Sequence, residues 1–150
     1  MKFRFRLQKL LEARKITQDL AQKEFQLALN ALNEQEKILL DLDQTRAHSY
    51  LRSGQLQDLG GPEAGRALQE NYEFQQGLAQ RRVLQNEKIK QAEDLVEKKR
   101  EILRQSTIEY KMIVRLREKE LDNFVQELKT LDQKESDEIA TLRFAHKDVK

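Results

Sequence analysis

The side chains in this sequence that could carry acid–base or metal chemistry are two histidines and many carboxylates. His48 and His146 each stand alone on polar positions of predicted helices, where a solvated histidine is commoner than a ligand or a general base. The carboxylates alternate with lysine and arginine at helical spacing, as in the run EDLVEKKREILR, which is typical of a solvated, ion-paired helix face. Because the chain has no cysteine, a thiolate metal site and a disulfide framework are excluded. The sequence therefore predicts a protein that is not an enzyme and has no cofactor or metal site.

A second motif, SGQLQDLGGPEAG at residues 53–65, contains the only proline and four of the five glycines. It has neither the spacing of a phosphate-cradling loop nor that of a nucleophile elbow. Glycine loses the most backbone entropy when it is fixed, and proline lacks the amide that a helix interior needs. The cluster therefore predicts a hinge at which the chain reverses between two helical arms.

The third pattern is a positive charge at the amino terminus. Residues 1–15 hold six basic side chains and only Glu12 as an acid, a local net charge of +5. Such an end could bind nucleic acid, acidic lipid headgroups or an acidic protein surface. Phe3, Arg4, Phe5 and Arg6 alternate aromatic with basic residues, but no base-stacking platform or groove-reading motif follows. We therefore expect no nucleic-acid partner.

The composition indicates long helices with a narrow apolar seam. The chain of 150 residues is 38% hydrophobic and 36% charged, and it is rich in Leu, Glu, Gln, Lys, Arg and Ala. Disorder is the alternative for so polar a chain, but the apolar residues keep helical spacing. No apolar run is long enough for a signal peptide or a membrane span. We expect a soluble cytoplasmic protein without direct membrane insertion.

The first arm carries a heptad repeat, the pattern of a left-handed coiled coil. Its seam is predicted at Leu7, Leu11, Arg14, Gln18, Ala21, Phe25, Ala28, Leu32, Gln35, Leu39, Leu42 and Arg46. Gly54 is placed to end this helix. The predicted fold is therefore all-α, a long antiparallel two-helix coiled-coil hairpin forming one domain over residues 1–150. Arm one spans about residues 3–52, the hinge about 53–65 and arm two about 66–147.

The second arm is predicted to begin with Pro62 at the first helical position, and Gly77 to kink or divide it after a short connecting helix. Its seam is predicted to drift. Leu84, Leu95 and Ile102 share one line, whereas Ile89, Val96, Leu103, Tyr110 and Ile113 lie on the neighbouring one. Because arm two is longer, we expect about 30 of its last residues to lack a partner in the chain, or 15 to 20 with a connecting helix. This amphipathic end is a candidate contact surface for another protein or another copy.

The chain resembles the FliJ family of flagellar export proteins along its whole length. The resemblance is carried by the opening FRFRLQKLLEARK, by EQEKILLDLDQTR late in the first arm and by the following NYEF. It implies a coiled coil similar to the rotor shaft of rotary ATPases, acting as central stalk of a hexameric export ATPase. It further implies contacts with the cytoplasmic domain of the export gate and with export chaperones. The protein would be cytoplasmic, peripheral at the inner face of the cell membrane through the export apparatus.

The resemblance also implies two sets of contact residues. At the paired ends of the hairpin, the ATPase would contact Phe3, Phe5, Leu7, Leu10, Leu11, Arg14, Leu121, Phe124, Val125, Leu128, Leu131 and Ile139, for which the intrachain seam is an equal alternative. Nearer the turn, an exposed cluster attributed to gate binding falls on Gln35, Leu39, Leu42, Arg46, Phe74, Leu78, Arg81 and Gln85. Leu42 and Arg46 depart from the aromatic and hydroxyl character that is common in the family.

The alternative function is a coiled-coil scaffold or holdase chaperone unrelated to an ATPase. Such a protein would use the same hairpin and hold its clients on the end of the second arm. An effect on hydrolysis and hexamer formation by an export ATPase would distinguish the two.

Overall fold

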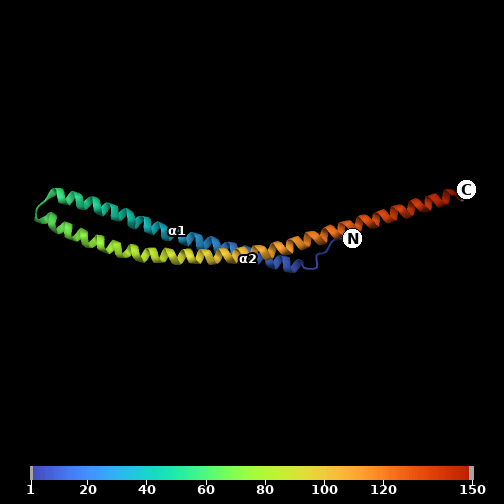
Figure 1. The fold of residues 1–150 in the computed structure, drawn as a ribbon, viewed down its shortest axis with the longest axis horizontal. Coiled ribbons are helices and arrows are strands. Elements are labelled where there is room, and N and C mark those ends of the chain that lie inside the picture. Colours follow the sequence, from blue (N-terminus) through green and yellow to red (C-terminus); the bar gives the residue numbers. More distant parts are fainter. Residues whose placement is uncertain (1, 149–150) are drawn as a thin grey trace. The chain divides into compact units, whose positions relative to one another are not determined.

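The computed structural model describes residues 2–148 and contains two long helices, α1 (Gln8–Leu59) and α2 (Pro62–Asp148). Figure 1 shows them running antiparallel and joined by one tight turn, and the described residues contain no strand. The predicted all-α helical hairpin is therefore confirmed. Neither helix has, within residues 2–148, a stretch both long and apolar enough to span a membrane.

The turn consists of only two residues, Gly60 and Gly61. Their φ angles of 66° and 94° lie in the left-handed region that glycine adopts without a steric penalty. Pro62 takes the first position of α2, as predicted, and Glu63 places a carboxylate in its first turn, where it complements the helix dipole. The reversal therefore needs two glycines and a proline, and no longer loop.

The predicted hinge at residues 53–65 is too long. Helix α1 continues through Gly54 to Leu59, and Gly65 already belongs to α2. Nor does Gly77 divide α2, so there is no separate connecting helix. A glycine inside a helix costs only about 1 kcal/mol relative to alanine. Pairing with the opposite helix offsets that cost, because Ser53 and Leu56 are half-buried on either side of Gly54.

The seam of the first arm lies where the heptad pattern predicts it. All twelve predicted seam residues, from Leu7 to Arg46, are buried or half-buried. The same spacing continues through Ser49, Ser53 and Leu56, beyond the point at which the apolar pattern fades. The arm therefore pairs along its whole length, including the stretch assigned to the hinge.

The seam of α2 does not drift, contrary to the prediction. It follows strict four-three spacing through Ala64, Leu68, Asn71, Gln75, Leu78, Arg82, Gln85, Ile89, Ala92, Val96, Lys99, Leu103, Ser106, Tyr110, Ile113, Arg117, Glu120 and Phe124. The line of Leu84, Leu95 and Ile102 lies outside it, with 64%, 44% and 48% of these residues exposed. Polar residues occupy so many seam positions of α2 that its heptad repeat cannot be recognised from the apolar residues alone.

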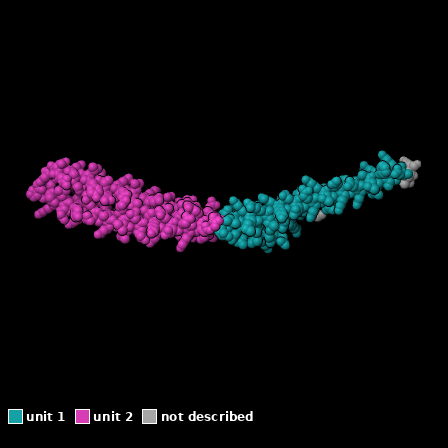
Figure 2. Space-filling view, in the orientation of Figure 1, with its two compact units in different colours: residues 1–19, 105–150 teal, residues 20–104 magenta. Residues whose placement is uncertain are grey.

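The chain divides into two compact units, shown in Figure 2. Unit 1 comprises residues 1–19 and 105–150, of which residues 2–19 and 105–148 are described, and unit 2 comprises Leu20–Arg104. Each unit contains a stretch of both helices, and its seam joins them. That the whole chain folds as one domain stays a prediction.

In unit 1 the residues before α1 pack on α2, so fewer residues at the end of α2 are left unpaired. Leu128 is the last half-buried side chain of α2, and every side chain of residues 129–148 is exposed. The unpaired stretch is thus 20 residues, against about 30 expected for an uninterrupted second arm. About half of the difference arises because residues 2–5 are non-helical, and extended chain advances about 3.3 Å per residue where helix advances about 1.5 Å.

Candidate partner-binding surfaces

Residues 2–7 form an N-terminal strap on α2 within unit 1. The rings of Phe3 and Phe124 lie 5.5 Å apart at 49°, and the Arg117 guanidinium lies 6.0 Å from the centre of the Phe3 ring. Phe5 is buried, at 7% exposure, whereas Lys2, Arg4 and Arg6 are exposed. Alternate residues of an extended chain point to opposite sides. The strap therefore buries its aromatic residues and presents its basic ones to solvent.

The residues proposed to contact the ATPase fall into two groups in the structure. Those engaged within the chain are Phe3, Phe5, Leu7, Leu11, Arg14, Leu121, Phe124 and Leu128, all buried or half-buried. Those exposed are Leu10, Val125, Leu131 and Ile139, at 36%, 39%, 46% and 52%. The strap and seam thus use the first group for packing, and only the second group has a large free surface.

Polar contacts connect the helices next to the strap. The Arg14 Nη1 atom lies 2.8 Å from Glu109 Oε2, and Gln18 Nε2 donates to Thr107 Oγ1 at 3.2 Å. Lys15 Nζ lies 5.4 Å from the centre of the Tyr110 ring. The side chains of Arg14 and Glu109 are 40% and 36% exposed, so their ion pair contributes little stability, on the order of 0.2–1 kcal/mol. Its main effect is to fix the register of α1 against α2.

The eight residues proposed for gate binding are brought together in unit 2, but mostly inside the seam. Leu78 and Gln85 are buried, at 3% and 5% exposure, and Gln35, Leu39, Leu42 and Arg46 are half-buried. Gln85 Nε2 donates to both the carbonyl oxygen and Oε1 of Gln35, at 2.8 Å each. Only Phe74, at 47%, and Arg81 are exposed. Six of the eight residues fall on seam positions, which limits their exposed surface, and the gate contact stays a prediction.

A buried polar cluster near the turn was missed by the sequence reasoning. Ser49 Oγ donates to Asn71 Oδ1 at 2.8 Å, and Asn71 Nδ2 donates to the Ser49 carbonyl oxygen at 2.8 Å and to Ser53 Oγ at 2.6 Å. Gln75 Nε2 donates to Ser53 Oγ at 3.1 Å. Continuing the heptad of α1 past Arg46 would have placed Ser49 and Ser53 in the seam. Buried asparagine in a seam specifies register at a cost in stability.

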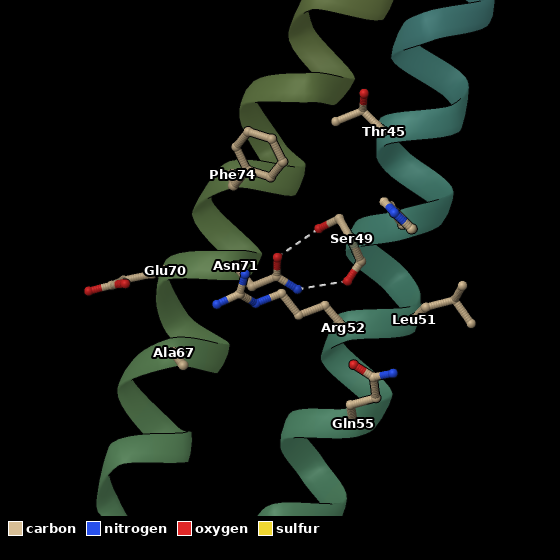
Figure 3. A pocket seen from close by; sticks show the side chains of 10 residues that line it. Thr45, Ser49, Leu51, Arg52, Gln55, Ala67, Glu70, Asn71 and Phe74 are labelled. Atoms are coloured by element: carbon tan, nitrogen blue, oxygen red, sulfur yellow. Dashed lines mark hydrogen bonds between the residues drawn. The ribbon is translucent and has the colours of Figure 1, made fainter.

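Beside this cluster lies a groove of about 710 Å³ between the two helices of unit 2. Figure 3 shows Thr45 and Phe74 pointing toward each other from α1 and α2 at one end of the groove, above the hydrogen-bonded Ser49 and Asn71. The groove is lined by Thr45, His48, Ser49, Leu51, Arg52, Gln55, Ala67, Glu70, Asn71 and Phe74. Small side chains at Ser49 and Ala67 leave this space open. It is a shallow contact surface with hydrogen-bonded polar groups along its floor.

The titratable groups of residues 2–148 form no arrangement suited to catalysis. His48 is an exposed groove residue, and His146 is exposed in the last turn of α2. A hydrogen bond from Arg104 lowers the pKa of Glu101, but both side chains are exposed on one helix face. Among residues 2–148, no three His, Cys, Asp or Glu side chains are grouped to hold a metal ion.

A comparison with protein families gives one match over nearly the whole chain. The model of a family described as "Flagellar FliJ protein" matches residues 2–148. No curated protein and no solved structure matches the chain. The match includes the strap, the seam and the unpaired end of α2.

Proposed function

This chain belongs to the FliJ family, a family of flagellar export components, and from that premise we propose that it is the non-enzymatic central stalk of the hexameric export ATPase. In this proposal it couples the ATPase ring to the cytoplasmic domain of the export gate and binds export chaperones. It works in the cytoplasm, peripheral at the inner face of the cell membrane through the export apparatus.

The observation that carries the proposal is the unpaired end of α2. Residues 129–148 are exposed throughout, and they include Leu131, Ile139, Leu142 and Phe144, of which 46%, 52%, 70% and 69% is exposed. Apolar side chains exposed on a helix that its own chain does not cover mark a surface for another protein. The basic residues of the strap, Lys2, Arg4 and Arg6, lie in the same unit and add positive charge.

The proposed mechanism is mechanical. A hairpin of two unlike helices presents a different surface to each subunit of a ring that surrounds it. Subunits in different nucleotide states then bind it with different affinities, and this difference biases ring assembly and turnover. The gate is contacted nearer the turn, where Phe74 and Arg81 are the two exposed residues of the proposed set.

The test is to mix the protein with its cognate export ATPase and to measure ATP hydrolysis and hexamer formation. We expect both to increase, and the double variant Leu131→Ser, Ile139→Ser to lose most of the increase. Val83→Ser, which changes an apolar residue that is 70% exposed in unit 2, is the control and should retain it. If the unmodified protein changes neither quantity, the stalk role is wrong and the scaffold or holdase chaperone is favoured.

A second measurement addresses the gate. Leu39→Ala combined with Phe74→Ala should weaken binding of the gate's cytoplasmic domain. Because Leu39 is half-buried in the seam, Phe74→Ala alone is needed to separate a lost contact from loosened helix pairing. Unchanged affinity in both variants, with unchanged helicity, would remove this assignment.

A further inference from the structure

One side of unit 2, here called the groove flank, is defined by the residues that line the groove. Residues seven apart on a coiled-coil helix lie on the same side. The flank therefore extends beyond the groove to the residues that lie seven, or a multiple of seven, positions from a groove residue. On α1 these are Ile38, in line with Thr45, and Asp41, Glu34, Leu27 and Leu20, in line with His48. On α2 they are Arg81, Lys88, Leu95 and Ile102, in line with Phe74, and Leu84 and Lys98, in line with Glu70. The groove is thus one end of a continuous flank.

The groove flank carries most of the exposed apolar residues of unit 2. They are Leu20, Leu27, Ile38, Leu51, Leu59, Phe74, Leu84, Leu95 and Ile102, each 44–76% exposed. The opposite side of the seam has Leu40, Tyr50, Tyr72 and Val83. Apolar residues scattered singly on a surface need no explanation, but a row of them along one side marks a contact surface.

Charges on the two edges of the groove flank are opposite in sign at each level. The seam contacts set the levels, since Gln35 contacts Gln85 and Asp43 contacts Arg82 at 2.8 Å. By that register, Glu34 on α1 lies level with Lys88 on α2, and Asp41 lies level with Arg81. Near the turn the basic residue lies on α1 and the acidic one on α2. Arg52 on α1 is level with Glu70 on α2, and both line the groove.

These charges are not used within the chain. Glu34, Asp41, Arg81 and Lys88 are all exposed, and none of them belongs to an ion pair among residues 2–148. The apolar residues follow the same order, since Leu20 is level with Ile102, Leu27 with Leu95 and Ile38 with Leu84. At each of these levels the two edges are therefore complementary, acid to base and apolar to apolar.

Such a flank is complementary to itself. A two-fold axis parallel to the helices brings the α1 edge of one copy over the α2 edge of the other at the same level. Every pair named above then recurs between the copies. A two-fold axis across the helices would place α1 over α1, so Glu34 would face Asp41 and Arg81 would face Lys88. Like charges in contact disfavour that second arrangement.

We propose that the groove flank binds the groove flank of a second copy of this chain, with the two turns at the same end. The product is a four-helix bundle in which acidic residues of one copy meet basic residues of the other at the charged levels, and apolar residues meet apolar ones at the other levels. The proposal does not rest on the export role, but it uses Phe74 and Arg81, the two exposed residues proposed above for the gate, so the second copy and the gate would compete for this surface.

The charge pattern supplies the main test. The variant Glu34→Lys, Asp41→Lys makes both edges basic in their central part, and Arg81→Glu, Lys88→Glu makes both acidic. Each should self-associate at least roughly tenfold more weakly than the unmodified chain in sedimentation velocity across the micromolar range at low salt. An equimolar mixture should restore the dimer, since each edge then meets its opposite. Glu36→Lys, Glu93→Lys changes the net charge by as much on exposed positions of the opposite side and should not weaken the dimer.

Orientation is tested by crosslinking, which the absence of cysteine simplifies. A chain with Glu34→Cys, mixed with a chain with Lys88→Cys, should form a heterodimer through a short bifunctional thiol reagent. Glu34→Cys mixed with Asp41→Cys should crosslink much less. Circular dichroism checks that each variant keeps its helicity. A monomer at all concentrations, a mixture that does not restore the dimer, or preferential crosslinking of positions 34 and 41 would overturn the proposal.

Discussion

Asn71 is the most heavily hydrogen-bonded seam residue near the turn, and it connects two serines of α1. Its amide nitrogen donates to the Ser49 carbonyl oxygen and to Ser53 Oγ, and its oxygen accepts from Ser49 Oγ. The residue is 9% exposed, so water does not readily replace a lost partner. Leaving buried polar groups without partners costs about 1–3 kcal/mol.

We therefore predict that Asn71→Ala lowers the free energy of unfolding by about 1–3 kcal/mol. Urea denaturation followed by circular dichroism measures the effect. Asn33→Ala, at an exposed position of α1, is the matched control and should stay within about 0.5 kcal/mol of the unmodified chain. Equal midpoints for both variants would show that the cluster does not hold the helices together.

A second prediction for single residues concerns the pKa of Glu101 and its effect on stability as the pH changes. The hydrogen bond from Arg104 stabilises the charged carboxylate and lowers the pKa of Glu101 below its ordinary 4.5. A lowered folded-state pKa stabilises the helix above pH 4.5, and this contribution is lost as the pH falls through the folded-state value. Both groups are exposed, so the effect on overall stability is small. In an NMR titration, Arg104→Gln should raise the pKa of Glu101 toward 4.5, and an unchanged value would show that Arg104 is not the cause.

The two helices differ in how much of them the sequence reveals. In α1, apolar residues occupy enough seam positions to identify the heptad, and the pattern predicted even Arg14, Gln18 and Gln35 as seam residues. In α2, Asn71, Arg82, Gln85, Lys99 and Ser106 occupy the seam, while Leu84 and Leu95 lie outside it. Helix α2 therefore carries apolar residues in two rows, one in the seam and one on the groove flank. The sequence pattern mixed these two rows, which is why it predicted a drifting seam.

The candidate contact sites were predictable only as regions. The resemblance selected the strap end and the stretch near the turn, but it could not separate exposed from buried residues within them. That separation depends on register, which is set by contacts such as Gln35 with Gln85, 50 positions apart in the sequence. The strap was missed for a similar reason, since the contact of Phe3 with Phe124 joins distant residues.

The glycines of the two helices supply a prediction at the scale of the element. At Gly54 and Gly77 an added Cβ atom would meet nothing within 4 Å, and both residues are helical. Gly54→Ala and Gly77→Ala should each raise the free energy of unfolding by up to about 1 kcal/mol. Gly61 also has open space, but its φ of 94° strains any other residue, so Gly61→Ala should lower stability. Denaturation midpoints compare the three, and a stabilising Gly61→Ala would contradict the assigned turn.

At the scale of the whole molecule, the residues that hold the two helices together differ from the exposed residues at the end of α2 that are proposed to contact the ATPase. Every seam, strap and interhelical hydrogen-bond contact described above lies within residues 2–128. Residues 129–148 add exposed apolar side chains and no buried ones. Loss of this end should therefore affect binding without affecting the stability of the rest.

Truncation after Leu128 tests this separation. We predict that the shortened chain unfolds in urea within about 0.5 kcal/mol of the full chain, since it loses no buried residue. It should lose most of the increase in ATP hydrolysis that the proposed function requires. Phe3→Ser is the complementary variant, because it removes the ring that packs on Phe124 and should destabilise unit 1 while leaving residues 129–148 intact. If truncation lowers stability as much as Phe3→Ser does, the end of α2 takes part in folding. If truncation leaves the ATPase effect unchanged, the ring is contacted elsewhere, and the basic residues of the strap become the next candidates.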